Sequence, residues 1–485
     1  MPEIPGLDRE LIISAMERAH IPGVSIAYMD NTTVDPLTTP IGRTDKRDSP
    51  VSTLMDSDSR VGAASLSKPV FAFLVLKLIE KGTLSRKGES AVSGLDRPLH
   101  EILPLENFFR DPKQTLSERD IERAKTITPR MLLAHISGIN DFNTQLSFEP
   151  GTEYAYSGMG LIYLQAAIEE EINKSLGENE AKKSLQDLAK EHVFDKLSLN
   201  MSFVPPSESK VPIGAANSLY TTASDYAKLM NAWMNDKSPI MQEAFVPQIS
   251  LINDHQVFPG GESAEHVNND IKNRLSWGLG LGLEVDAADK KKAVKAFHTG
   301  DMNQWRAQMA LDLDKKSCIV YFANADSDLK ANGHTLGPLI ITPKIPVDYA
   351  HTWFYSKFPF ALHIDQLSEE SRFGTRVQGE DKKADSDAVM AAFMSKSAST
   401  PAPSTHEKRE ASDASLEVQA GSSYAVMRAL MPTQSPAPVS SPEITKQSTE
   451  ESSHTMAVEV ESLAETDKPS SPSPFKMTPK APSDL

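Results

Sequence analysis

The chain has 485 residues, a length that allows two or three domains, or one large enzyme domain followed by a tail. Its 50 Lys and Arg against 66 Asp and Glu give a formal charge of −16, which argues against a protein that binds nucleic-acid phosphates. The single cysteine, Cys318, excludes an intrachain disulfide and a zinc site built from several cysteines. The 12 histidines show no metal-binding spacing either, so we expect no metal and no cofactor.

The N-terminal sequence carries no recognisable signal for export or for membrane insertion. Residues 1–9 lack a basic segment followed by an apolar run, so no secretory signal peptide is expected. The longest apolar stretch, residues 70–79, contains Lys77 and is about half as long as the ~20 residues that a membrane helix needs. We therefore expect no membrane span, and a protein that is cytoplasmic or is exported without a cleavable signal peptide.

Apolar periodicity predicts an early strand, a helical middle and a group of late strands. A helix over residues 11–19 precedes an alternating strand over residues 23–29. Further helices are expected at residues 65–81, 129–135, 160–171, 184–197 and 222–235, and strands at residues 277–285, 294–298, 305–311 and 318–324. This order indicates an α+β fold. Both chain ends build one antiparallel sheet with helices packed on it, and a mostly helical domain is inserted between them.

The composition changes sharply near residue 365. All four tryptophans lie before that point, whereas segments rich in Ser, Pro and Thr begin at Ser397, Ser435 and Pro469. Such segments bury too little apolar surface to offset the entropy of ordering them. We predict one large folded domain over residues 1–365, a linker with a possible helix over 366–395, and a disordered acidic tail over 396–485. The tail is either a solubilising segment or a site for a protein partner or a secretion machinery.

The segment Ser65-Leu66-Ser67-Lys68 is the first candidate for chemistry. A serine at a helix start lies near free backbone N–H groups and the positive end of the helix dipole. Lys68 follows Ser65 by three residues and therefore stands on the same face one turn away. A lysine kept neutral by burial can take the serine proton. The alternative is that Ser65 merely caps the helix, since serine is a common N-cap residue.

A second candidate is the segment Tyr154-Ala155-Tyr156-Ser157-Gly158, which precedes an apolar helix. A tyrosine on a turn beside the serine could act as a phenolate base or as a proton shuttle. The alternative is that both tyrosines are packing residues at the end of a strand.

The third candidate, His298-Thr299-Gly300-Asp301, ends an apolar strand-like run. Gly300 would allow close approach of the backbone, and a substrate along this strand would meet the Thr299 hydroxyl and the Asp301 N–H. Paired with the N–H of Ser65, the Asp301 N–H could form an oxyanion hole. The alternative is that His298 caps a strand.

The order and spacing of these three segments resemble the serine β-lactamase and penicillin-binding-protein superfamily. The resemblance is to the branch that holds class C β-lactamases, D-alanyl-D-alanine carboxypeptidases and family VIII esterases, and it extends over residues 10–330. Further resembling segments are Ile21–Val24, Gly94–Pro98, Met131–Gly138, Phe148–Gly160, Leu219–Asp225 and Trp277–Gly280. It implies a β-lactamase/transpeptidase-like fold and two-step acyl transfer.

The resemblance also implies roles for single residues. Ser65 matches the acylated nucleophile, Lys68 its partner, and Tyr156 the tyrosine of the second motif. His298-Thr299-Gly300 stands where the family has Lys-Thr-Gly, and Gly158 stands where it has asparagine. Histidine titrates near pH ~6.5, so hydrolysis should change in the middle pH range and His298→Lys should flatten that profile.

Both departures weaken the recognition of a substrate carboxylate and of an acylamino side chain. They therefore favour a serine hydrolase that forms a Ser65 acyl-enzyme with a small ester or amide, as an esterase does. One alternative is a β-lactamase or a D-Ala-D-Ala carboxypeptidase. A second is a catalytically idle binding scaffold of the same fold.

Overall fold

The structure is a computed structural model that describes residues 4–19, 21–45, 52–109, 116–141, 145–177, 180–203, 214–252, 269–302, 304–324 and 336–348. The predicted linker (366–395) and tail (396–485) lie outside the described residues, as does the end of the predicted first domain.

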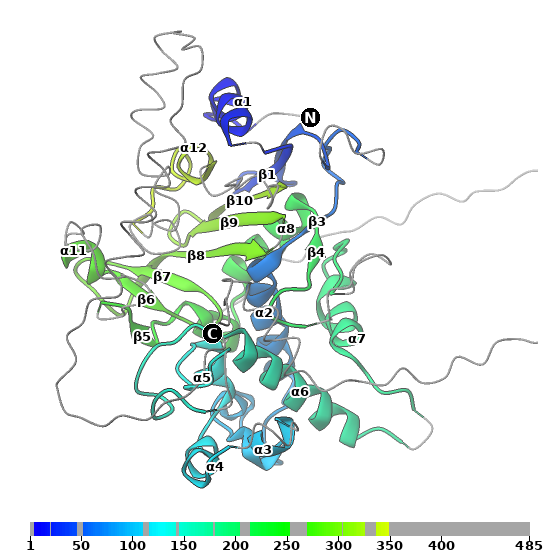
Figure 1. Ribbon diagram of the computed structural model, residues 1–485, viewed down its shortest axis with the longest axis vertical. Coiled ribbons are helices and arrows are strands. Elements are labelled where there is room, and N and C mark those ends of the chain that lie inside the picture. The colour runs from blue at the N-terminus through cyan, green and yellow to red at the C-terminus, as the bar shows by residue number, and fades with distance from the viewer. Residues whose placement is uncertain are drawn as a thin grey trace, which may run out of the picture. The chain divides into compact units, whose positions relative to one another are not determined.

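Strands from the two ends of the described chain form one eight-stranded antiparallel sheet with the order β2-β1-β10-β9-β8-β7-β6-β5 (Figure 1). β1 (Gly23–Met29) pairs with β10 (Ser317–Asn324), and Gly23 lies opposite Asn324. The expectation that the early strand closes a sheet of late strands is therefore confirmed. The other strands of the sheet are β2 (Leu37–Gly42), β5 (Ile249–Ser250), β6 (Leu275–Trp277), β7 (Gly282–Val285), β8 (Ala293–Met302) and β9 (Trp305–Asp312), and a separate pair is formed by β3 (Val61–Gly62) and β4 (Tyr220–Thr221).

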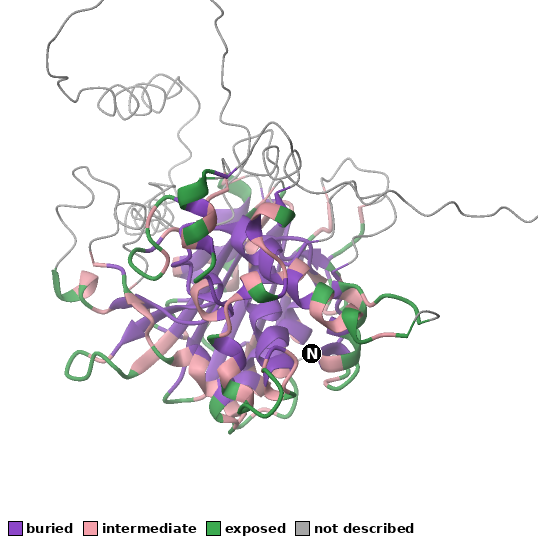
Figure 2. Ribbon diagram, turned by 90° about the horizontal axis from the view of Figure 1, so that it is seen from below, coloured by how far each residue is buried: buried purple, intermediate pink, exposed green. Residues whose placement is uncertain are grey.

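Helices cover both faces of this sheet. On one face, α1 (Arg9–Arg18) and α12 (Gly337–Ile340) pack on side chains that include Val24 and Ile26 of β1. On the other face, the β1 side chains that alternate with these pack into the core around α2 (Ser67–Glu80) and α8 (Ala223–Asn235). Both faces are thus apolar, and Figure 2 shows the strands largely buried with exposed residues at the periphery.

The central helix α2 is buried on nearly all sides, because its run from Val70 to Ile79 is almost continuously apolar. The helix ends where the chain adopts a positive φ of 82° at Gly82, whose N–H donates to the Ile79 carbonyl at 2.8 Å. α2 therefore provides a rigid support for the residues at its N-terminus, where Lys68 stands.

The middle of the chain is mostly helical, as expected, and its helices α3 to α6 gather away from α1 and α12 (Figure 1).

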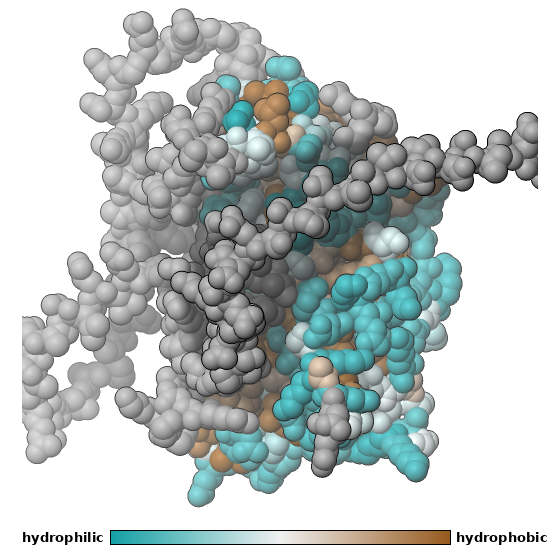
Figure 3. Space-filling model, turned by 90° about the vertical axis from the view of Figure 1, so that its right-hand side faces the viewer, coloured by the Kyte–Doolittle hydropathy of each residue, from teal (hydrophilic) through white to brown (hydrophobic). Residues whose placement is uncertain are grey.

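Hydrophilic side chains cover much of the lower part of the face in Figure 3. The remaining elements are η1 (Ala64–Leu66), η2 (Ala91–Leu95), η3 (Leu99–Glu101), α3 (Leu105–Phe108), α4 (Glu118–Ala124), α5 (Pro129–Leu133), α6 (Gly158–Lys174), α7 (Leu185–Ala189), η4 (Lys190–Phe194), α9 (Pro239–Gln242), η5 (Glu243–Phe245) and α11 (Asn269–Lys272).

Candidate active site

Ser65 lies in η1, which is one turn of 3-10 helix immediately before α2. The preceding Ala64 has a left-handed φ of 48°, a conformation that costs a residue with a Cβ ~1–2 kcal/mol. The turn is held by the buried Ser67, whose Oγ donates to the Ala64 carbonyl at 2.6 Å and accepts from the Leu219 N–H at 3.0 Å. The strained turn thus presents Ser65 from a fixed backbone, and Ser67 has a positioning role that the sequence did not reveal.

Lys68 is 3% exposed, and its Nζ lies 2.9 Å from Ser65 Oγ. The same Nζ donates to the Ala216 carbonyl at 2.8 Å and sits 4.9 Å from the ring centroid of Tyr156. Burial lowers the pKa of Lys68 to about 7, although the charge of Asp141 acts in the opposite direction. Near neutral pH a large fraction of Lys68 is therefore unprotonated and able to accept the Ser65 proton.

Tyr156 contacts both members of this pair. Its hydroxyl hydrogen-bonds Ser65, but burial, the largest influence, raises its pKa above the ordinary value, and the charge of Asp141 adds to that rise. The free site therefore holds a protonated phenol, which favours the proton shuttle over the phenolate base. At neutral pH Lys68, unlike Tyr156, therefore has a large unprotonated fraction that can act as the base.

Two residues that the sequence did not assign to the site hold the Tyr156 loop. The Nδ1 atom of His135 accepts from the Ser157 N–H at 3.2 Å, and its ring centroid lies 4.5 Å from that of Tyr156. Asp141 accepts a hydrogen bond from Ser157 Oγ at 3.0 Å and also binds the first backbone N–H groups of α6. Neither contact has a local sequence signal, because both span 16 or more residues.

His298 behaves differently from the expectation. It is buried in β8, and its Nδ1 lies 2.7 Å from the Thr299 carbonyl, so the proton of the neutral ring is on Nδ1. Burial, and then the nearby charge of Lys68, lower the pKa of His298 to about 3. The expected titration of His298 near pH ~6.5 is therefore wrong, and Lys68 is the group of this pair that titrates near neutrality.

Gly300 lies directly against the nucleophile turn. A Cβ at this position would stand 2.7 Å from the Ala63 carbonyl oxygen and 3.3 Å from the Ala64 Cβ, so a side chain would push β8 away from Ser65. Its neighbour Thr299 is 8% exposed. The sequence predicted a close backbone approach at Gly300, and the structure shows that the segment approached is the nucleophile turn.

Asp301 forms an ion pair with Arg306 across the β8–β9 hairpin, with 3.3 Å between Arg306 Nη1 and Asp301 Oδ1. The two residues face each other in the antiparallel register. The oxyanion hole from the N–H groups of Ser65 and Asp301 stays a prediction.

Trp277 of β6 brings the aromatic groups of the second and third segments together. Its ring centroid lies 5.4 Å from that of His135, 6.0 Å from that of Tyr156 and 5.6 Å from that of His298. Edge-to-face contacts of this kind fix ring orientations. The sequence had marked Trp277 only as part of a family segment.

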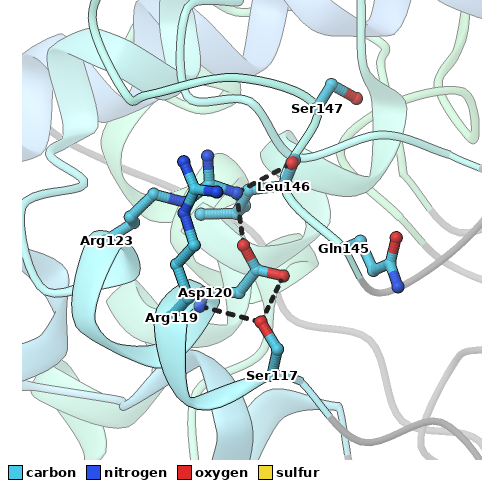
Figure 4. Close-up of a pocket in the computed structure, with 7 residues that line it drawn as sticks. All are labelled: Ser117, Arg119, Asp120, Arg123, Gln145, Leu146 and Ser147. Carbon is cyan, nitrogen blue, oxygen red and sulfur yellow. Dashed lines mark hydrogen bonds and ion pairs between the residues drawn. The ribbon is translucent and has the colours of Figure 1, made fainter.

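The hollow shown in Figure 4 is lined by a different set of residues from those of the candidate site. It measures about 360 Å³, and none of Ser65, Lys68, Tyr156 or His298 lines it; the lining residues are Ser117, Arg119, Asp120, Arg123, Gln145, Leu146 and Ser147. Its arginines are paired with carboxylates, since Arg119 and Arg123 both bind Glu149 and Arg123 also binds Asp120. This polar network links α4 to the loop that carries Leu146, whose carbonyl accepts from Arg123 at 2.9 Å.

Within the described ranges, no three His, Cys, Asp or Glu side chains are grouped to hold a metal ion. No helix in the same ranges has the length and apolar character needed to cross a membrane.

Comparison with known proteins identifies the family. The family model described as Beta-lactamase matches residues 9–336, about two thirds of the chain, and the chain therefore belongs to this family. The β-lactamase/transpeptidase-like fold expected from the sequence is confirmed. A comparison with curated proteins gave no match.

Solved structures similar to this chain include two from different organisms. One is an octameric penicillin-binding protein homologue from Pyrococcus abyssi, with 16% identity, a TM-score of 0.48, and coverage of 73% of this chain and 79% of that chain. The other is a β-lactamase/D-alanine carboxypeptidase from Pseudomonas syringae, with 16% identity, a TM-score of 0.48, and coverage of 70% and 99%.

Proposed function

We propose that the protein is a serine hydrolase that acts on a small ester or amide through an acyl-enzyme on Ser65. The observation that carries the proposal is the 2.9 Å contact between Ser65 Oγ and the Nζ of Lys68, whose pKa is lowered to about 7. A base with a pKa near the working pH combines a useful unprotonated fraction with useful basicity. The hydrogen bond between Ser65 and Tyr156 connects a third proton-carrying group to the same oxygen.

The reaction follows from these contacts. Lys68 takes the proton of Ser65 as Oγ bonds to the substrate carbonyl carbon, and the tetrahedral intermediate expels the alcohol or amine. Tyr156 passes a proton to the leaving group and is reprotonated from Lys68. Water then attacks the acyl-enzyme and gives up a proton to Lys68, which passes it to Ser65 Oγ as this oxygen leaves, so that the acid is released and Ser65 is restored.

The third segment favours an ester or amide without a carboxylate at the position next to His298. A neutral histidine with its proton directed to the Thr299 carbonyl supplies no cation there. Gly158 supplies no amide, and the Ala216 carbonyl accepts from Lys68 instead. These features support esterase-like chemistry over a β-lactamase or D-Ala-D-Ala carboxypeptidase.

The test is intact-mass spectrometry of the full chain after exposure to a fluorophosphonate, with a short-chain aryl ester and penicillin in parallel. We expect a fluorophosphonate adduct and aryl-ester turnover in the wild type, and neither in Ser65→Ala. Penicillin turnover that exceeds ester turnover would favour the β-lactamase alternative. The absence of any adduct or turnover would overturn the proposal and leave the idle scaffold.

A further inference from the structure

We propose that Asp141 is a positioning residue of this site, whose carboxylate clamps the start of α6 behind Tyr156 and whose negative charge acts on Lys68. The kinetic part of this inference rests on the proposed function.

The clamp consists of three hydrogen bonds to one carboxylate. Asp141 Oδ1 accepts from the Met159 N–H at 2.7 Å and from Ser157 Oγ at 3.0 Å, and Oδ2 accepts from the Gly158 N–H at 3.1 Å. Ser157 is itself the N-cap of α6, since its Oγ accepts from the Gly160 N–H at 2.9 Å. A carboxylate bound to the first N–H groups of a 17-residue helix is favoured by the helix dipole and satisfies donors that lack helical partners.

This clamp acts directly on the Tyr156 loop. Tyr156 immediately precedes Ser157, so the bond from Ser157 Oγ to Asp141 helps to fix the position of Tyr156, as does the separate bond from the Ser157 N–H to His135. The asparagine expected two residues after Tyr156 is replaced by Gly158, which brings no side chain of its own. Asp141, from a loop 17 residues earlier, supplies a polar group at that point.

The charge acts on Lys68. Several polar or titratable groups surround this amine, namely Ser65 before its own helix, Tyr156 before α6, His135 after α5, His298 on β8, and Asp141. Burial lowers the pKa of both histidines, so neither ring adds a positive charge near neutral pH. Asp141 is the carboxylate among these groups, and its charge opposes the effect of burial on the pKa of Lys68.

The primary experiment measures the pH dependence of Ser65 phosphonylation by a fluorophosphonate in the wild type, Asp141→Asn and Ser157→Ala. Asp141→Asn removes the charge and keeps a similar shape, so the acidic limb should move to lower pH by about half a unit to one unit. Ser157→Ala weakens the same clamp but keeps the carboxylate, so its thermal midpoint should fall while the acidic limb stays in place. A limb in Asp141→Asn that coincides with the wild-type limb would overturn the proposal.

A second readout does not need activity. Lys68 takes up a proton on unfolding, which makes the free energy of unfolding depend on pH. This contribution is isolated by subtracting the unfolding free energy of the same protein carrying Lys68→Met. In the Asp141→Asn background this dependence should extend to lower pH than in the wild type. If the wild type never reacts with the probe, the proposed function fails, yet identical pH dependence in both backgrounds would still refute the role of Asp141.

Discussion

Replacing Lys68 by Met should stabilise the protein at neutral pH and remove part of its pH dependence. The pKa of Lys68 is about 7 in the folded chain, against an ordinary value of 10.5, because burial disfavours the charged amine. Above pH 10.5 the amine is neutral in both states and costs nothing. As the pH falls toward 7 the unfolded chain takes up a proton that the folded chain resists, so stability is lost in this window and the loss is complete below pH 7.

The size of the effect follows from these two values. The full separation of the two pKa values corresponds to about 5 kcal/mol, of which about 4 kcal/mol applies at pH 7 and about 2 kcal/mol at pH 9. The stability advantage of Lys68→Met over the wild type should therefore shrink by about 2 kcal/mol between these two pH values. Losing the hydrogen bond to the Ala216 carbonyl adds an offset that does not change with pH.

The assay is urea unfolding of both proteins at pH 7, 8 and 9, followed by tryptophan fluorescence, since Trp233 and Trp277 are buried in the fold. Subtracting the two free energies of unfolding cancels the contributions of groups that titrate equally in both proteins. A difference that stays constant across these three pH values would show that Lys68 keeps its ordinary pKa, and would refute its role as a neutral base.

Three further substitutions test separate parts of the site. Gly300→Ala should lower the unfolding free energy by about 1–3 kcal/mol and slow Ser65 labelling at least about tenfold, because the new methyl group meets the backbone of the nucleophile turn. Thermal melts and labelling rates equal to those of the wild type would contradict this. Tyr156→Phe should reduce ester turnover about 10²–10⁴-fold with little change in the thermal midpoint, and an unaltered rate would exclude the proton shuttle. His298→Gln should keep the acidic limb of the activity profile near pH 7, because His298 is already neutral there and Lys68 sets the limb; its disappearance in this variant would contradict that assignment.

The sequence predicted the architecture well because its signals were local and repeated. Alternation in residues 23–29 and apolar strand-like runs later in the chain identified strands of the sheet, and the apolar run before Gly82 identified α2. The single strand expected over residues 277–285 is instead two strands, β6 and β7, because the chain turns between them, where Gly280 has a φ of 77°. The three-residue spacing of Ser65 and Lys68 predicted that they share one helical face, and their contact at 2.9 Å agrees with it. These predictions need only the chain's own periodicity.

Protonation states were beyond the reach of the sequence. A histidine at position 298 indicates a group that titrates near pH ~6.5, but only the packed structure shows that it is buried and bonded to the Thr299 carbonyl. The same holds for Lys68, whose lowered pKa depends on complete burial beside Tyr156. Burial is a property of the assembled core, so residue type alone gives the wrong pKa for His298.

The sequence by itself thus determined most of the longer helices and strands, that both chain ends share one sheet, and which serine and lysine lie one turn apart. The tertiary structure decided which distant groups complete the site. The Ala216 carbonyl, the His135 ring and the Asp141 carboxylate reach it from separate loops, and β8 reaches it at Gly300. Such contacts leave no periodic or spacing signal, because they depend on how elements pack and not on how each one forms.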